Sequence, residues 1–238
     1  MKLSRNIFMI SVFSMLLSSC GNFSSITGCP DGEIEWVDMV MINDIKYQHH
    51  FPEPTDENNL LPIEKGRELG KVTFKMADRA CSNHQMKNGD AAYLDEGTPI
   101  YEVKGYPSSL IVVADDKAFL VDTNKKAKTA DNLYPLDGLV KNIYNESTED
   151  GSRIQTFTQA STNKFLDAWS RLKLEDPESL YKKGNMEGDR IFLEIELNNG
   201  VPFRLVYWVD SNVFSNGAIG NKEIKKVIED ELSNNISE

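Results

Sequence analysis

The stretch RIFLEIELNNGVPFRLVYW, residues 190–208, decides the fold because it predicts a β-hairpin. Apolar and polar residues alternate along both arms, which is the pattern of strands that bury one face. A two-residue turn at Asn199-Gly200 would place Leu193 opposite Val206 and mix the buried and exposed faces. Because a one-residue slip moves every side chain to the other face, this register is unfavourable.

A three-residue loop over residues 198–200 keeps the apolar face intact. It pairs Leu193 with Leu205 and sets Glu194 directly across from Arg204 on the opposite face. The glycine that ends the loop then takes the left-handed conformation that such loops require. We therefore expect this register.

The rest of the chain divides into two parts of different character. Residues 138–238 predict an α+β domain, in which two more strands lie between residues 139 and 158 and join an antiparallel sheet. Residues 29–137 contain short strands at roughly 8–12-residue spacing between Gly/Pro turns, which is typical of a small barrel or sandwich. We expect an α+β protein with a β-rich, barrel- or sandwich-like N-terminal domain followed by the α+β domain.

Two helices are expected in the second part. Apolar residues recur at helical spacing from Phe165 to Leu172, with Ser161 or Thr162 as the N-cap. Asn221 is expected to cap a terminal helix whose apolar residues form a single stripe. We expect both helices to cover one face of the antiparallel sheet.

The strands expected within residues 29–137 combine β-branched and aromatic residues, with turn signals between them. Asn43-Asp44 and Asp115-Asp116 predict the turns of two hairpins, and the segments 52–62 and 82–90 predict loops. The expected strands are residues 36–42, 45–47, 71–76, 91–94, 100–103, 110–113 and 119–121.

The first twenty residues, MKLSRNIFMISVFSMLLSSC, indicate export rather than a folded element. Two basic residues precede an apolar run, residues 7–17, that is shorter than the roughly 20 residues of a membrane span. The segment resembles the bacterial lipobox, whose cysteine is acylated with diacylglycerol and becomes the new N-terminus. The resemblance implies a signal peptide over residues 1–19, a lipidated Cys20 and a tether over residues 20–28.

This reading places the protein on the outer face of the cell membrane, held by the lipid on Cys20. A single acyl chain anchors a protein only marginally, so the two or more chains implied by the lipobox matter for stable attachment. An ordinary cleaved signal peptide with a coincidental Cys20, or an uncleaved N-terminal anchor, are the alternatives.

Composition excludes several classes of partner. The chain has 238 residues and a formal charge of −11, and removal of the signal peptide leaves 24 basic against 37 acidic residues, a charge of −13. A domain this acidic is poorly suited to bind nucleic acid or an anionic lipid surface. Hydrophobic residues make up 40% of the chain, which fits a globular fold.

The remaining cysteines, Cys29 and Cys81, form an even pair in an oxidising compartment and predict a disulfide. The alternative is a zinc or copper site made from Cys81, His84, His49 or His50, and Cys29. The C-x-x-H spacing permits chelation, but adjacent histidines in a strand point to opposite faces. A disulfide would remove both thiolates from such a site.

Catalytic motifs are poorly represented in the sequence, and we expect neither an enzyme nor a cofactor. The chain has no G-x-S-x-G elbow, phosphate loop, dinucleotide fingerprint or complete EF-hand loop. The acidic pairs Asp115-Asp116 and Glu175-Asp176 are typical of turns and helix caps. Asp31-Gly32-Glu33 lacks the other ligands of a calcium loop.

Aromatic residues offer a candidate binding surface. Tyr101 and Tyr106 flank a glycine turn, so they are the surface candidates for a sugar- or peptide-binding groove, whereas Trp169 and Tyr207 are assigned to the core. The other aromatic residues considered for such a groove are Trp36, Tyr93 and Trp208.

Five segments of the mature chain resemble a family of uncharacterised lipoproteins of Gram-positive bacteria. They are Trp36-Val37-Asp38, residues 42–47 (INDIKY), Gly70-Lys71-Val72, residues 89–106 (GDAAYLDEGTPIYEVKGY) and residues 205–212 (LVYWVDSN). The resemblance implies a lipoprotein and carries no activity, substrate or site residue. Part of the fourth segment, GTPIYEVKGY, also looks like a strand of small SH3-like barrels, which is an analogy of fold and not of function.

Three functional hypotheses follow. The first is a non-enzymatic binding or structural lipoprotein of the cell envelope, which presents the Tyr101–Tyr106 region to an envelope protein or wall component. The second is a lipoprotein that binds a metal or small ligand in the Cys81/His84 region. An enzyme that acts on the envelope is the third and least supported.

Overall fold

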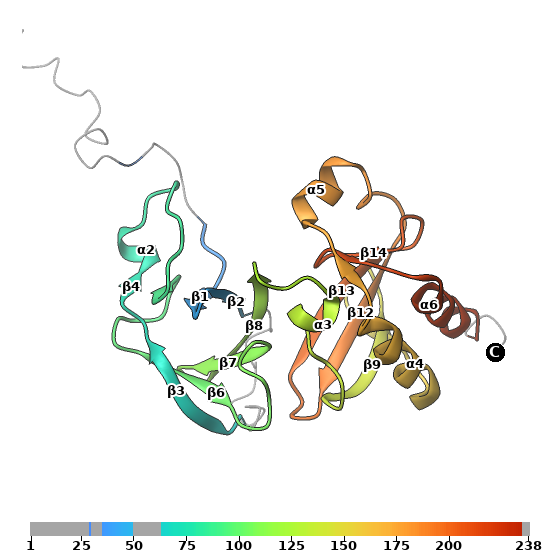
Figure 1. Cartoon of the computed structure of the whole chain (residues 1–238), viewed down its shortest axis with the longest axis horizontal. Coiled ribbons are helices and arrows are strands. Elements are labelled where there is room, and N and C mark those ends of the chain that lie inside the picture. The colour runs from blue at the N-terminus through green and yellow to red at the C-terminus, as the bar shows by residue number, and fades with distance from the viewer. Residues whose placement is uncertain (1–28, 30–34, 50–62, 235–238) are drawn as a thin grey trace, which may run out of the picture.

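The computed structural model describes residues 29, 35–49 and 63–234, and it divides them between two sheets (Figure 1). The lipobox with Cys20, the tether, the segment around Asp31, His50 and the segment 52–62 lie outside the described residues. The two-sheet architecture confirms the expected α+β class with a β-rich first part. None of the helices in the described ranges combines the length and the apolar character needed to span a bilayer.

The first sheet has eight strands in the order β3-β6-β7-β8-β2-β1-β5-β4. β4 and β5 pair in parallel, and the other described pairs are antiparallel. The two predicted hairpin turns are confirmed, since Asn43, Asp44, Asp115 and Asp116 all have positive φ. The strands are β1 (Met39–Ile42), β2 (Ile45–Gln48), β3 (Lys65–Lys71), β4 (Phe74–Lys75), β5 (Asp90–Ala91), β6 (Pro99–Val103), β7 (Ile111–Ala114) and β8 (Lys117–Asn124).

The predicted strand over residues 71–76 is wrong. β3 ends at Lys71, β4 has only two residues, and the short helix α2 (Met76–Arg79) follows at once. Val72 and Thr73 leave the β3 ladder because their N–H groups donate to the carbonyls of Thr98 and Gly89. β3 itself was missed because its mostly exposed, polar residues show no apolar alternation.

The second sheet has seven strands in the order β10-β9-β12-β13-β14-β15-β11. The predicted register of its central hairpin is confirmed: Leu193 pairs with Leu205, Glu194 pairs with Arg204, and Gly200 has a φ of +85°. The strands are β9 (Val140–Glu146), β10 (Arg153–Thr156), β11 (Lys173–Leu174), β12 (Arg190–Leu197), β13 (Pro202–Trp208), β14 (Val213–Phe214) and β15 (Ala218–Ile219).

Helices α4 (Gln159–Trp169) and α6 (Lys222–Asn234) lie together on one side of the second sheet, as Figure 1 shows. The N-cap of α6 is Asn221, as predicted, and its Oδ1 accepts from the Ile224 N–H at 2.8 Å. The N-cap of α4 is Thr158 rather than Ser161 or Thr162. The apolar spacing predicted the start of the helix too late, because the first turn is polar and adds nothing to the apolar pattern. Of the pair Glu175-Asp176, Asp176 is confirmed as a cap, since it is the N-cap of α5 (Pro177–Lys182), whereas Glu175 pairs with Lys183.

Aromatic residues fill the space between these helices and the sheet. Trp169 is 1% exposed, stacks on Phe165 at 5.9 Å and meets Phe214 edge-on at 5.2 Å. Tyr207 is also 1% exposed, and burial raises its pKa to about 12. Both residues therefore belong to the core, as expected.

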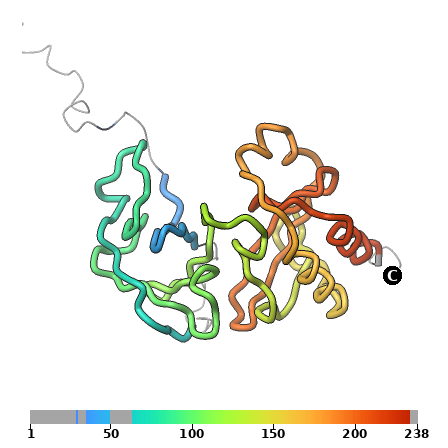
Figure 2. Tube along the Cα trace, in the orientation of Figure 1, coloured from blue at the N-terminus to red at the C-terminus, as the bar shows by residue number. Residues whose placement is uncertain are grey.

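A connecting segment between Asn124 and Val140 joins the two sheets (Figure 2) and contains the short helix α3 (Ala130–Leu133). Tyr134 links the sheets directly. Its hydroxyl donates to the Val121 carbonyl at 2.9 Å, and its ring stacks on Phe203 at 5.3 Å. Buried residues of both sheets accordingly form one continuous core.

Candidate functional site

A disulfide fixes the start of the loop over residues 82–89. Cys29 and Cys81 are bonded, with Cα atoms 5.2 Å apart, across 52 positions of sequence. The predicted disulfide is therefore confirmed. Because both sulfurs are bonded to each other, neither offers a thiolate to a metal ion, and this part of the alternative metal site is wrong.

The other end of the loop closes against β1 and Thr73. The Gly89 N–H donates to the Met41 carbonyl at 2.8 Å, and the Thr73 N–H donates to the Gly89 carbonyl at 2.7 Å. Gly89 has a φ of +92°, and a Cβ there would lie 2.2 Å from Thr73 Oγ1. Only glycine fits this close approach, so both ends of the loop are held against the sheet.

His84 lies within this loop in a fixed orientation. Its Nε2 is 2.7 Å from Asp90 Oδ2, which also accepts the Lys87 N–H at 2.8 Å. Asp90 is 5% exposed, and the His84 ring stacks on Phe74 with centroids 5.2 Å apart. A carboxylate only accepts hydrogen bonds, so we assign a proton to Nε2, and in the neutral imidazole Nδ1 then carries the lone pair.

A pocket of about 510 Å³ lies beside His84, under the loop. Its volume is within the range of small-ligand sites. β1 supplies part of the wall, because alternate residues of a strand face the same side. The lining residues are Trp36, Met39, Met41, Asp44, Lys46, Met76, His84, Gln85, Met86, Thr123 and Lys125.

Four methionines line the pocket from three places in the fold. Met39 and Met41 alternate along β1 with the buried Val40, so both are on the pocket side of the strand. Met76 begins α2 and is only 1% exposed, whereas Met86 comes from the loop and is half-buried. These methionines were not among the predicted ligands, which were histidines and cysteines. The available signal was His84-Gln85-Met86 together with two methionines on one strand face.

Charged residues lie around the same pocket. Hydrogen bonds from Asn88 and then Lys126 lower the pKa of Asp44, whose oxygens are 2.9 and 3.2 Å from their nitrogen atoms. Lys46 and Lys125 also contribute to the lining. The one carboxylate among the lining residues is therefore already paired with a cation.

His49, the other histidine with a described position, does not line this pocket. His49 Nδ1 lies 2.8 Å from the Ala118 carbonyl, against the ring of Phe119. In the described part of the chain, no three side chains of His, Cys, Asp or Glu gather closely enough to hold a metal ion. Of the predicted metal ligands with described positions, only His84 lines the pocket.

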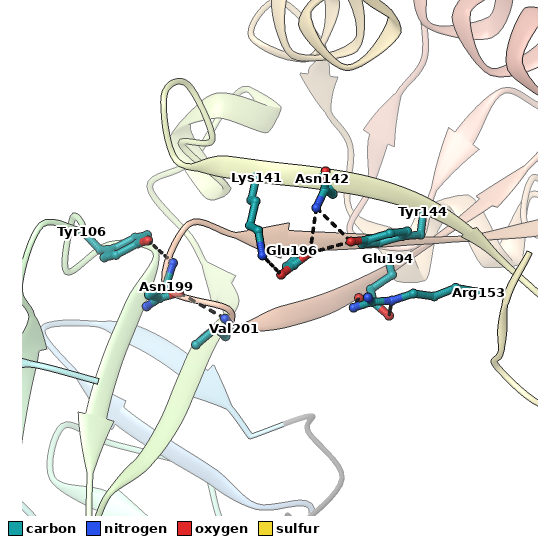
Figure 3. Close-up of polar contacts among 9 residues, drawn as sticks. All are labelled: Tyr106, Lys141, Asn142, Tyr144, Arg153, Glu194, Glu196, Asn199 and Val201. Carbon is teal, nitrogen blue, oxygen red and sulfur yellow. Dashed lines mark hydrogen bonds and ion pairs between the residues drawn. The ribbon is translucent and has the colours of Figure 1, made fainter. Parts of the chain in front are cut away.

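The proposed surface tyrosines lie elsewhere, at β6 and the turn that follows it. The Tyr106 hydroxyl accepts the Asn199 N–H at 2.8 Å and so contacts the hairpin loop of the second sheet (Figure 3). Burial raises the pKa of Tyr106. Tyr101 is half-buried, with the Lys65 ammonium 5.7 Å from its ring centre. The Tyr106 hydroxyl thus has a structural partner within the chain.

A second polar cluster lies on the second sheet, on the face opposite the core (Figure 3). Glu196 is 8% exposed and accepts from Lys141 at 2.8 Å, Asn142 at 3.0 Å and Tyr144 at 2.7 Å. Burial opposes ionisation, but these three hydrogen bonds outweigh it and lower the Glu196 pKa to about 2.

Two further carboxylates of this cluster also have cationic partners. Glu194 pairs with Arg153, and Glu146 pairs with Arg204. Burial raises the pKa of Glu194, and the neighbouring Glu146 adds to the rise against the effect of Arg153. The predicted strand register around Glu194 is right, but Arg204 makes its ion pair with Glu146, one strand further along. We interpret this cluster as structural, because each carboxylate holds its own cation.

Comparisons with known proteins were made with family models, curated proteins and solved structures, and none of the three finds a match to this chain.

Proposed function

We propose that this chain is a lipid-anchored extracytoplasmic protein that works by binding rather than by catalysis. The observation that carries the proposal is the Cys29–Cys81 disulfide, because disulfides form and persist in oxidising compartments outside the cytoplasm. Cys29 follows the lipobox Cys20 by nine positions. The signal for export and the chemistry that export permits therefore occur together at the start of the mature chain.

Binding is favoured over catalysis by the kind of side chain at the pocket. His84 aside, whose Nε2 is engaged by Asp90, the thioethers and the indole of the pocket neither gain nor lose a proton near neutral pH and are poor general acids and bases. They are suited to hold a ligand in a partly enclosed site. The three carboxylates of the cluster on the second sheet, Glu146, Glu194 and Glu196, are each paired with a cation.

The presence of this pocket favours the hypothesis of a small ligand over the hypothesis of a macromolecular partner bound at Tyr101 and Tyr106. His84 lines this pocket, whereas Cys81, the other candidate ligand of the region, anchors the loop through its disulfide. A partner surface at Tyr101 and Tyr106 stays a prediction. It is tested by substituting both residues with alanine and measuring capture of the envelope partner.

The anchor is tested by labelling cells that produce the full chain with a palmitate analogue. We expect the wild type to be labelled and to fractionate with membranes, and Cys20→Ala to lose the label. The intact mass of the membrane-extracted protein should rise by two hydrogens on reduction, as Cys29 and Cys81 open. Labelling that survives Cys20→Ala, or two free thiols before reduction, would contradict the proposal.

A further inference from the structure

The methionines of this chain are concentrated in one place. The described residues contain five methionines, at positions 39, 41, 76, 86 and 186. The first four line the pocket beside His84. Methionine often fills irregular gaps in a core, and Met76, which is 1% exposed, fits that role. Met39, Met41 and Met86 are only half-buried and border open space, so core filling does not explain their convergence.

Thioether sulfur is a soft, uncharged ligand. Soft ligands select Cu(I), whereas carboxylates, carbonyls and water select magnesium, calcium and manganese. The single carboxylate at the pocket, Asp44, is hydrogen-bonded to Asn88 and Lys126. A hard divalent cation would therefore find few oxygen ligands here and would be repelled by Lys46 and Lys125. A soft monovalent cation would be repelled less, and four methionines are present in the lining.

His84 is held as metal-binding histidines usually are. Such a histidine donates its second ring N–H to a carboxylate, which fixes its tautomer and ring orientation. Asp90, 5% exposed, accepts from His84 Nε2 at 2.7 Å, and the stacked Phe74 restrains the ring. The remaining nitrogen, Nδ1, belongs to a side chain that lines the methionine pocket. An apolar ligand would have no need of an imidazole oriented in this way.

We propose that this pocket binds Cu(I) through the thioethers of Met39, Met41 and Met86 and through Nδ1 of His84. Trp36, which also lines the pocket, helps to exclude water and offers a π face to a cation. The inference deepens the proposed function and rests on it in one respect, that the pocket is a binding site. It is independent of the lipid anchor.

The test uses the full chain in detergent with Cys20→Ser in every variant, so that no free thiol competes for the metal. Cu(I) is supplied as its acetonitrile complex without oxygen, and bicinchoninate competes for it. Met41→Leu with Met86→Leu, and separately His84→Asn, remove ligands while they nearly preserve side-chain volume. Met186→Leu is the matched control, because Met186 does not line the pocket.

We expect the parent chain and Met186→Leu to retain one Cu(I) per chain against the chelator. The double methionine variant and His84→Asn should bind at least about tenfold more weakly. Retention equal to that of the parent in both variants, or no retention in the parent, would overturn the inference. In that second case the pocket takes an apolar ligand or none. Palmitate labelling of Cys20 reports on the anchor separately, so the two failures are distinguishable.

A second measurement does not depend on the folding of variants. Methionine methyl groups labelled with carbon-13 are followed by NMR while Ag(I), a soft monovalent analogue of Cu(I), is added to the parent chain. We expect the methyl signals of Met39, Met41 and Met86 to shift and that of Met186 to stay. Equal shifts at all of these positions, or none, would contradict a specific site.

Discussion

The two halves of the molecule gather their functional side chains in different surroundings. On the second sheet, Glu146, Glu194 and Glu196 each hold a basic side chain, so the charges are satisfied within the sheet. The pocket of the first half collects thioethers, which carry no charge, together with an imidazole, one carboxylate and two lysine side chains. The difference teaches that charged side chains paired with one another stabilise the fold, whereas unpaired methionine side chains stay available to bind a small ligand.

The halves also differ in what stabilises them. The second depends on an aromatic layer between α4, α6 and its sheet, in which Phe165, Trp169 and Phe214 contact one another. In the first, the loop over the pocket is fastened by the Cys29–Cys81 disulfide and by the close approach at Gly89. The substitutions below test this comparison from both sides.

The largest effect is expected in the aromatic layer. Trp169→Ala removes a side chain that is 1% exposed and whose Nε1 donates to the Tyr134 carbonyl at 3.1 Å. We expect the free energy of unfolding to fall by about 3–5 kcal/mol, as for other buried large-to-small changes, measured by urea denaturation. Tyr181→Ala, at a residue that is 66% exposed, is the control and should change it by less than about 0.5 kcal/mol. A loss below about 1 kcal/mol for Trp169→Ala would refute the aromatic layer as the main support of this half.

Loss of the disulfide should weaken the first half selectively. Cys29→Ala with Cys81→Ala opens a loop of 52 positions, and we expect a loss of about 2–4 kcal/mol. Amide hydrogen exchange should speed up across residues 82–89 and stay unchanged in α4. Equal acceleration in both halves would show that the two regions unfold as one unit and would remove the contrast between them.

The fold could be predicted best where one face of an element is buried and the other is exposed. The register of the hairpin from β12 to β13 follows from its alternation alone, and the structure has it. β3 escaped prediction because its residues are largely exposed, and its place in the sheet depends on pairing with β6. Such tertiary pairing leaves no periodic mark in a local sequence.

The candidate site was predicted only in part. The disulfide follows from the even pair of cysteines and is present. His84 lines the pocket, and its role as a ligand stays a prediction. The methionine cluster could not be predicted, because Met39 and Met41 are far in sequence from Met86. They meet only when residues 89–92 fold back along β1. Long-range contacts of this kind are not readable from one sequence.

The charged cluster around Glu196 should make the free energy of unfolding depend on pH. The Glu196 pKa is lowered to about 2 in the folded chain, so its ionised form stabilises the fold above its ordinary pKa of about 4.5. That contribution is lost as the pH falls from there towards 2. We expect Glu196→Gln to cost of the order of 1–2 kcal/mol at pH 7 and the difference from wild type to shrink below pH 4.5, in urea titrations at each pH.

The control for the charged cluster is Glu178→Gln. Glu178 pairs with Lys182 on the surface of α5, and its side chain is 72% exposed. Exposed ion pairs contribute little, so a change below about 0.5 kcal/mol is expected. If Glu196→Gln is as mild as this control at pH 7, the cluster on the second sheet is not a scaffold and becomes a candidate for binding instead.

The smallest effect concerns the start of α4, where the cap position differs from the predicted one. Thr158 Oγ1 accepts the Ser161 N–H at 3.2 Å and donates to Glu231, a residue of α6 that is 2% exposed. Thr158→Ala should therefore cost about 1 kcal/mol, and Thr158→Ser, which keeps the hydroxyl, should restore most of it. Ser161→Ala should cost less, because the structure uses only its backbone N–H at the cap. If Ser161→Ala lowered the temperature of thermal unfolding more than Thr158→Ala does, Ser161 rather than Thr158 would be the N-cap. It would also mean that the Thr158 hydroxyl adds little to the contact between α4 and α6, which the Thr158 N–H still makes by donating to Glu231 at 3.1 Å.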